Sequence, residues 1–265
     1  GGKVALLSGR TAGDWEYRTT DQLPKYIKKA LEGKAGEDVF IEGPYHVLAS
    51  YAPLEIEGLR WVIVSTIDVE EALVPRATER YRDLFAQHKD LQAYDDILLT
   101  TADGDVFYSV SKGKDYRTNL LTGPYQDTAL GQLLRQVIEE RRPGFADFAP
   151  YAPADGKLAA FIAHPVVHND ETEFVVAIRL PIDGLNAIMT ERVGMGETGE
   201  TYLVGQDGRM RSDSYRSPET HSAVASFAGT VEKNGVETEA ARRALAGETG
   251  VGVVRNYLGQ QVVSA

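Results

Sequence analysis

The sequence predicts an α+β fold in which antiparallel sheets are flanked by helices. Residues 94–180 give, in order, two strands, a helical region and three strands, an order typical of one sheet covered by helices. Asp-Gly pairs at 103–104 and 207–208 each lie between two apolar runs. This pattern is typical of β-hairpins, because glycine supplies the positive φ that the turn needs. A helix–strand–turn–strand unit also occurs twice, which again favours antiparallel pairing.

The N-terminal part of the chain, 1–75, contains one expected helix and several expected strands. Residues 4–7 form a short apolar strand, and residues 22–31 predict a helix. Pro24 lies in its first turn and Gly33 just beyond its end, the usual asymmetry of helix ends. The strands that follow are 38–42, 45–52 and 60–67, with turns at Gly43-Pro44 and Glu57-Gly58. Within the last strand, residues 62–67 are nearly all β-branched, which predicts a central and largely buried position.

Helices are expected next, and they would connect the modules of the chain. Asp68 can cap a helix that starts at Val69, and Pro75 interrupts it. From Arg80 to Leu91, apolar residues recur at spacings of three and four, so one face should pack, with His88 on that side. No histidine or carboxylate lies four residues after His88 to complete a metal-binding pair.

Residues 94–180 are expected to form a complete antiparallel sheet. A hairpin turns at Ala102-Asp-Gly-Asp105, and residues 126–140 predict a helix with its leucines on one face, ended by Pro143-Gly144. The strands are 94–100, 105–110, 145–149, 158–167 and 174–180. Strand, strand, helix and three strands is the order of a PAS-like fold.

The C-terminal part opens with a helix at 182–192 and a glycine-rich turn. Gly194-x-Gly196-x-x-Gly199 has the spacing of the dinucleotide-binding fingerprint. That fingerprint follows a strand and opens a helix, so that the helix N-terminus meets the pyrophosphate. Here the order is reversed, and we interpret the glycines as a helix-to-strand connection. The elements expected after them are strands at 201–204 and from Met210, a helix at 236–246, and strands at 251–255 and 261–265.

One unit of the sequence occurs twice, once near each end of the chain. Ala30-Leu-Glu-Gly33-Lys-Ala-Gly36 matches Ala244-Leu-Ala-Gly247-Glu-Thr-Gly250, and both copies continue as strand, turn and strand. The first copy goes on into the strand at 60–67, whereas the second stops before the equivalent position. A sheet without that strand would expose an unpaired edge.

Composition excludes several classes of function. With 265 residues and 43% hydrophobic residues, the chain can build real cores. A net charge of −11 argues against nucleic acid or an anionic membrane surface as partner. Without cysteine, disulfides, thiolate catalysis and cysteine-ligated metals are excluded. There is no apolar run long enough to cross a bilayer and no signal-peptide pattern, so we expect no membrane-spanning segment within this sequence.

Several stretches together resemble the double Cache domains, PAS-like extracytoplasmic sensors of bacterial chemoreceptors, histidine kinases and cyclases. GETGETYLVGQDGRMRSDS, residues 196–214, resembles the start of the membrane-proximal half. The stretches that resemble the membrane-distal half are YDDILLTTADGDVFYSV (94–110), NLLTGPY (119–125), DFAPYAP (147–153) and AAFIAHPV (159–166). The resemblance covers about residues 76–265. It implies PAS-like (Cache) modules, each an antiparallel five- to six-stranded sheet flanked by helices, linked by a long helix.

The repeat leaves two domain organisations open. In the first, 1–75 is the C-terminal part of one Cache module, 76–190 a complete second module, and 191–265 a membrane-proximal-type module that is incomplete at its C-terminus. In the second, 1–75 folds back and supplies the missing strands to 191–265, which is feasible because the termini of compact domains often lie close together. The apolar strand at 4–7 favours a distinct first module.

We find no constellation of catalytic or metal-binding residues. The chain has no Gly-x-Ser-x-Gly elbow, Walker loop, His-Glu-x-x-His motif or EF-hand spacing. The five histidines are scattered, at positions 46, 88, 164, 168 and 221. We therefore expect no enzyme, no cofactor and no metal.

The resemblance implies that ligand binds in the complete second module, between the sheet and its helical loops, a region that corresponds to residues 94–164. A small-molecule site needs a mostly apolar surface with a few fixed polar groups. The candidate ligand-binding residues are Tyr108, Asp115, Asn119, Tyr125, Asp147, Tyr151, Phe161 and His164. For several of them a core, turn or capping role is the alternative. The Arg, Trp-Tyr and Tyr…Asp arrangement of the amino-acid-binding subgroup is not found, which argues against an amino-acid ligand.

The expected function is ligand sensing outside the cytoplasm as part of a bacterial transmembrane signal transducer. The partner would be a small molecule of unknown identity, and the long helix could form a homodimer. Contact with the membrane would come only from flanking helices outside this sequence, and the fragment itself would be periplasmic. The alternative is a structural or protein-interaction Cache module that senses a periplasmic binding protein, with an enzyme as a third class.

Overall fold

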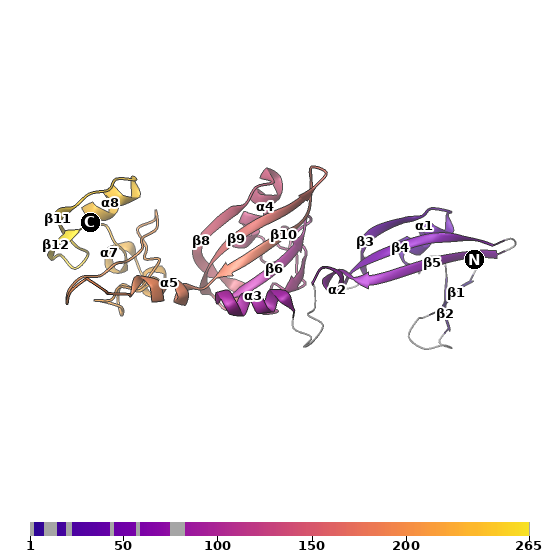
Figure 1. Ribbon diagram of the computed structural model, residues 1–265, viewed down its shortest axis with the longest axis horizontal. Helices are drawn as coiled ribbons and strands as arrows, with labels where there is room; N and C mark the ends of the chain where they lie inside the picture. Colours follow the sequence, from indigo (N-terminus) through magenta and orange to yellow (C-terminus); the bar gives the residue numbers. More distant parts are fainter. Residues whose placement is uncertain are drawn as a thin grey trace. The chain divides into compact units, whose positions relative to one another are not determined.

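The computed structural model describes residues 3–7, 15–19, 23–42, 45–56, 59–74 and 83–264. It divides into two compact units, residues 1–87 and 88–265 (Figure 1). Some sequence predictions lie outside the described residues. They concern the opening Gly1-Gly2, the turns at Gly43-Pro44 and Glu57-Gly58, Pro75, and the start of a helix at Arg80.

The first unit contains a three-stranded antiparallel sheet with one helix on one face. The strands are β3 (Gly36–Glu42), β4 (Tyr45–Ile56) and β5 (Leu59–Asp68), in that order across the sheet. Helix α1 (Lys25–Leu31) packs against it through a core of Leu23, Tyr26, Ile27, Ala30, Ala49 and Tyr51. A separate hairpin pairs β1 (Lys3–Leu7) with β2 (Trp15–Thr19), and sequence patterns did not predict β2. The strands of residues 36–68 therefore pair with one another.

Strand β5 does not have the central, buried position that its β-branched sequence predicted. It lies at the edge of the sheet, beside β4. Val62 and Val64 pack toward the helix, whereas Trp61 and Ile63 on the other face are each 57% exposed. The prediction of a largely buried strand was wrong, because β-branched residues fit any pleated surface and do not report whether both faces are covered.

The connection between the sheets contains two separate helices in the described residues. Helix α2 (Val69–Leu73) is capped by Asp68, whose Oδ1 accepts from the Glu70 N–H at 2.8 Å, as predicted. It ends at Leu73 because Val74 is extended, the conformation favoured before a proline. Helix α3 (Leu84–Gln92) follows residues 75–82, which are not described. On α3, His88 and Leu91 are exposed, so their predicted packing role was wrong.

The second unit contains the predicted five-stranded antiparallel sheet. Its strands are β6 (Asp96–Thr101), β7 (Val106–Ser109), β8 (Gly144–Tyr151), β9 (Lys157–His168) and β10 (Glu171–Leu180). The order across the sheet is β7-β6-β10-β9-β8, and every pairing is antiparallel. Strands β6 and β7, which come first in the sequence, therefore lie beside the later strands β8, β9 and β10 through the pairing of β6 with β10. A short 3₁₀ turn, Ala152–Ala154, joins β8 to β9. The predicted PAS-like sheet is confirmed.

Helix α4 (Ala129–Glu140) covers one face of this sheet. Thr128 caps its N-terminus by accepting the Gly131 N–H at 3.2 Å, which satisfies one of the free donors of the first turn. The leucines at i, i+3 and i+4 and Val137 face inward, as their spacing predicts. The buried core that results contains Leu98, Val106, Leu120, Leu130, Leu133, Leu134, Val137, Tyr151, Ala159, Phe161, Ala163, Val175 and Ala177.

The C-terminal part of this unit has less regular structure than predicted. Helix α5 (Ile182–Met189) is present, but the expected strands at 201–204 and from Met210 reduce to one bridge between Val204 and Met210. The Leu203 N–H donates to the Ser212 hydroxyl at 2.9 Å instead of to a strand partner. The further elements are α6 (Ala223–Ala228), α7 (Val231–Asn234), α8 (Glu239–Leu245), β11 (Gly252–Arg255) and β12 (Gln261–Ser264). Short helices α6 and α7 were not predicted.

The sequence repeat is visible in the backbone. Helices α1 and α8 begin and end at equivalent residues, and Gly33 and Gly247 follow them at φ +86° and +82°. The hairpins then diverge, because Val39 pairs with Leu48 whereas Val253 pairs with Val263, one position later. A shift of one residue turns a strand's side chains to the opposite face. Val263 is accordingly exposed, although its equivalent Ala49 is buried.

Candidate functional site

A cluster of polar side chains lies on the α4-facing side of the five-stranded sheet. Asp96 on β6 is opposite Arg179 on β10, and Arg179 is opposite Phe161 on β9. Because side chains alternate along a strand, these residues share the face of the core. Asp115, in the loop after β7, and Tyr151, at the end of β8, complete the cluster. Strands and loop thus bring together residues far apart in the sequence.

The Asp115 carboxylate is buried and only half satisfied. The residue is 1% exposed, and its Oδ2 accepts the Tyr151 hydroxyl at 2.6 Å. Oδ1 is also buried but accepts no hydrogen bond from the described residues. Burial raises the pKa of Asp115 above its ordinary value, the bond from Tyr151 and the residue's own backbone N–H oppose this, and the charge of Asp96 raises it further. A buried acceptor without a donor costs about 1–3 kcal/mol, so Oδ1 is a place for a donor that the described residues do not supply.

Tyr151 is held as a hydrogen-bond donor. Burial raises its pKa, and the carboxylate of Asp115 raises it further, so the hydroxyl keeps its proton. Its ring meets that of Phe161 edge to face, with centroids 4.8 Å apart, an arrangement favoured between aromatic quadrupoles. Tyr151 therefore gives the cluster an apolar wall and a fixed polar tip.

Unlike Asp115, Asp96 accepts hydrogen bonds with both of its carboxylate oxygens. The N–H groups of Ile97 and Ser111 donate to Oδ1 at 2.8 and 2.9 Å. The hydroxyls of Ser109 and Ser111 donate to Oδ2, the first at 2.9 Å. Such bonds stabilise a buried carboxylate. Asp96 thus anchors the start of the 110–125 loop, which carries Asp115.

Arg179 supplies the positive charge of the cluster. Its Nη2 donates to the backbone oxygen of Asp95 at 3.3 Å, and Nε lies 3.7 Å from Asp95 Oδ2. That distance is too long for a hydrogen bond, and the buried Nε has no hydrogen-bond partner among the described residues. The positive charge of Arg179 acts to lower the pKa of both Asp115 and Tyr151. Within the described part of the chain, Asp115 Oδ1 is therefore an acceptor without a donor, and Arg179 Nε is a donor without an acceptor.

We expect Asp115→Asn to stabilise the second unit in a pH-dependent way. The pKa of Asp115 is raised in the folded state, so its contribution to stability is complete below its ordinary pKa and is lost as pH rises through the folded value. The amide keeps an acceptor for Tyr151 but carries no charge. The free energy of unfolding should rise by about 1 kcal/mol at pH 7 and by much less near pH 4. Denaturant unfolding at several pH values measures this, and equal effects at both pH values would contradict it.

The structure brings together four of the eight predicted ligand residues. Asp115, Tyr151 and Phe161 are members of the cluster, and Tyr125 is half-buried against the same core. Tyr108 is buried on β7, but it is opposite Leu99. Leu99 alternates with Leu98 of the core, so Tyr108 belongs to the other face of the sheet.

The remaining three predicted residues have other surroundings. Asn119 is a turn residue: its Oδ1 accepts from the N–H groups of Leu121 and Thr122, both at 2.8 Å. Asp147 is in an ion pair with Arg211. His164 is exposed, and its Nδ1 lies 2.9 Å from the Pro165 oxygen. These three positions are away from the buried cluster.

Sequence reasoning missed Asp96 and Arg179. The signal for Asp96 was a carboxylate at the head of the apolar run Asp96-Ile-Leu-Leu99, and the signal for Arg179 was a charge inside the last apolar strand. Charged residues are almost never fully buried unless they are paired. Only the strand order places the two opposite each other, because they lie far apart in the sequence.

A second polar cluster lies in the C-terminal part and satisfies itself. Tyr257 and Ser214 donate to the two oxygens of Glu200 at 2.5 and 2.8 Å. The His221 ring lies 4.4 Å from that of Tyr257, and burial lowers the pKa of His221. Among the described residues, no group of three histidine or acidic side chains could hold a metal ion. No helix in the described part of the chain has the length and apolarity needed to cross a bilayer.

Comparison with known proteins finds similarity in sequence to a chemoreceptor. A probable chemoreceptor of Sinorhizobium fredii, y4sI, is 28% identical over 140 residues, which are 51% of this chain. The chain covers 18% of the length of that relative. This chain is similar to a chemoreceptor. No family model matches it.

Solved structures with partial similarity are receptor and sensor domains. An extracellular ligand-binding receptor from Desulfohalobium retbaense is 14% identical, with a TM-score of 0.44, and the match covers 65% of this chain and 28% of the other. The ligand-binding domain of the Pseudomonas fluorescens chemoreceptor CtaA, in complex with L-serine, is 19% identical, with a TM-score of 0.37 and coverage of 52% and 56%. The periplasmic sensory domain of the Campylobacter jejuni chemoreceptor Tlp1 is 16% identical, with a TM-score of 0.38 and coverage of 60% and 55%.

Proposed function

We propose that this chain is an extracytoplasmic Cache-type sensor region that binds a small molecule at the buried cluster of its second unit. The observation that carries the proposal is Asp115 Oδ1, a buried carboxylate oxygen with no donor among the described residues. The order of elements in the five-stranded sheet and the sequence similarity to a chemoreceptor support it. The chain would bind the small molecule and change conformation, without converting that molecule chemically.

The chemistry of the cluster favours a ligand that donates hydrogen bonds. Two carboxylates, Asp96 and Asp115, face one guanidinium, Arg179. A protonated amine would supply a donor to Asp115 Oδ1 and balance part of the negative charge. An acceptor on the same molecule would meet Arg179 Nε, and the rings of Tyr151 and Phe161 would contact its apolar part. We therefore infer a small amine that also carries an acceptor group.

In the intact protein, this region would lie in the periplasm, and flanking helices would anchor it in the membrane. The signal would pass as a small change in the position of elements that lead toward the membrane or in the packing of a dimer. We propose three modules in this region: a separate first module, 1–75, a complete module, 76–190, and a partial module, 191–265. The module 76–190 would bind the ligand.

A thermal-shift screen of the whole chain tests the proposal. The panel contains amino acids, polyamines, purines, dicarboxylates and divalent cations. A ligand that binds only the folded state stabilises it by about 2.7 kcal/mol at a hundredfold excess over Kd. We expect amines to raise the Tm of the second unit and dicarboxylates without an amine to leave it unchanged. A shift from dicarboxylates alone would contradict the inferred chemistry, and no shift from any compound would contradict direct sensing.

A further inference from the structure

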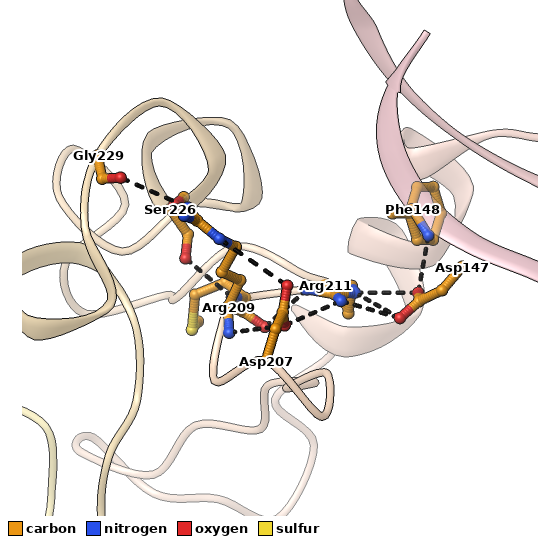
Figure 2. A network of polar contacts seen from close by, with 8 residues as sticks. Asp147, Phe148, Asp207, Arg209, Arg211, Ser226 and Gly229 are labelled. Atoms are coloured by element: carbon orange, nitrogen blue, oxygen red, sulfur yellow. Dashed lines mark hydrogen bonds and ion pairs between the residues drawn. The ribbon is translucent and has the colours of Figure 1, made fainter. Parts of the chain in front are cut away.

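Arg211 lies at the centre of an ion-pair cluster that joins the five-stranded sheet to the C-terminal part of the same unit (Figure 2). Its Nε donates to both oxygens of Asp147 at 2.9 and 3.0 Å, and its Nη2 lies 2.9 Å from Asp147 Oδ2. Nη2 also lies 3.0 Å from Asp207 Oδ1. The Arg211 side chain is 10% exposed and that of Asp147 49%. We call Arg211, Asp147 and Asp207 the clasp.

The surroundings of Arg211 are built to hold its guanidinium. Nη1 donates to the Arg209 carbonyl at 3.0 Å, and the Phe227 ring centroid is 4.9 Å away, a cation–π distance. At Gly205, a Cβ would collide with the guanidinium. Burial acts to lower the pKa of Arg211, but the bonds and charges of Asp147 and Asp207 outweigh it and raise that pKa. The arginine therefore stays charged and fixed.

The sheet side of the clasp is a bulge in an edge strand. Strand β8 is at the edge of the sheet, and β9 is its one partner among the described strands. Ala146 pairs with Phe161 and Ala149 pairs with Ala159. Two residues of β8 therefore lie opposite a single residue of β9. Bulges redirect side chains and bend the strand. Here the bulge contains Asp147, which bonds Arg211, and Phe148, which packs in a cluster with Ala223 of α6.

The same strand ends at the buried polar cluster. Tyr151, four residues after Asp147, donates to Asp115 Oδ2 at 2.6 Å. One end of β8 is thus tied to the 110–125 loop and its bulge is tied to Arg211. A shift of Tyr151 would be carried along β8, which is paired with β9 at Ala149 and Pro150, to the bulge that contains Asp147.

We propose that β8 is a conformational relay, in which the clasp passes a change at the Asp115–Tyr151 bond to residues 203–229. The role of that bond as the ligand contact rests on the proposed function, but the mechanical connection does not. The segment that receives the change has few strand-type backbone hydrogen bonds. The Arg211 N–H donates to Leu203 O at 2.7 Å, and the Met210 N–H donates to the Ser226 hydroxyl at 3.0 Å. These amides report on it.

Hydrogen exchange in the ligand-free chain tests the relay. Tyr151→Phe removes the bond to Asp115 and keeps the ring. We expect amide exchange in a peptide covering 203–212 to become about fivefold faster, because local opening sets the exchange rate. Asp147→Asn should speed the same amides about tenfold by breaking the clasp itself. In the double variant, exchange in 203–212 should be as fast as in Asp147→Asn alone. Once the contact between Asp147 and Arg211 is broken, the loss of the Tyr151 hydroxyl can no longer affect these amides.

The control is Lys114→Ala, at the residue that precedes Asp115 in the sequence; it breaks an exposed ion pair with Asp155 and removes no contact of β8. It should leave exchange in 203–212 unchanged. If Tyr151→Phe does not fold, Asp115→Ala removes the same bond from its other side and takes its place. Unchanged exchange in either variant, or additive effects with Asp147→Asn, would overturn the relay. Because no ligand is present, this failure is separate from failure of the thermal-shift screen.

Discussion

Gly131→Ala is expected to lower the free energy of unfolding of the second unit by about 3 kcal/mol, because overpacking against fixed backbone costs this much. A Cβ at this position would lie 2.5 Å from the Gln126 carbonyl oxygen and 2.8 Å from that of Leu120. Both oxygens belong to the loop that leads into α4, which packs on the core. Backbone atoms cannot rotate away as a side-chain end can, so α4 must shift relative to this loop.

Gly252→Ala is the matched control for this substitution. No atom of the described residues lies within 4 Å of the Cβ that it would add, and its φ is outside the left-handed region. Its effect on unfolding should stay within about 0.5 kcal/mol, the range of surface changes. Urea unfolding followed by circular dichroism compares the two variants. Equal stabilities would show that α4 does not sit as closely on its loop as the structure indicates.

Asp115→Ala is expected to raise the Kd of the proposed amine ligand about a hundredfold, since it removes the carboxylate that we propose as the partner of the ligand's charge. It also leaves the Tyr151 hydroxyl without its acceptor. Isothermal titration with the best compound of the screen measures the change. The control, Asp155→Ala, removes a carboxylate that is 76% exposed on its side chain. A similar loss in both variants would indicate a general effect of charge and would remove Asp115 from the site.

Much of the fold could be predicted because local rules agree with it. The Asp-Gly hairpin at 103–104, the amphipathic helix α4 and the Asp68 cap each appear where the sequence places them. The pairing of Val204 with Met210 did not extend into strands, because the Ser212 hydroxyl takes the Leu203 N–H. Side chains that compete for backbone groups are not visible in a hydrophobic pattern.

The candidate site could be predicted only in part, for a related reason. Tyr151 and Phe161 were found because they are aromatic residues in a region that the family resemblance marks. Arg179 and Asp96 were missed, because they become neighbours only through the order of strands in the sheet. Asp147 was predicted as a ligand contact, and the structure pairs its carboxylate with Arg211, a distant residue in the sequence. Long-range ion pairs of this kind leave no mark in local sequence.

A crystal structure of the chain with the most stabilising amine of the screen would test the central claim most directly. We predict density for the ligand between the sheet and the 110–125 loop, with its amine within hydrogen-bond distance of Asp115 Oδ1 and an acceptor facing Arg179 Nε. Tyr151 and Phe161 should border it. Ligand bound elsewhere, with Asp115 Oδ1 still lacking a donor, would contradict the assignment of this cluster as the sensor site.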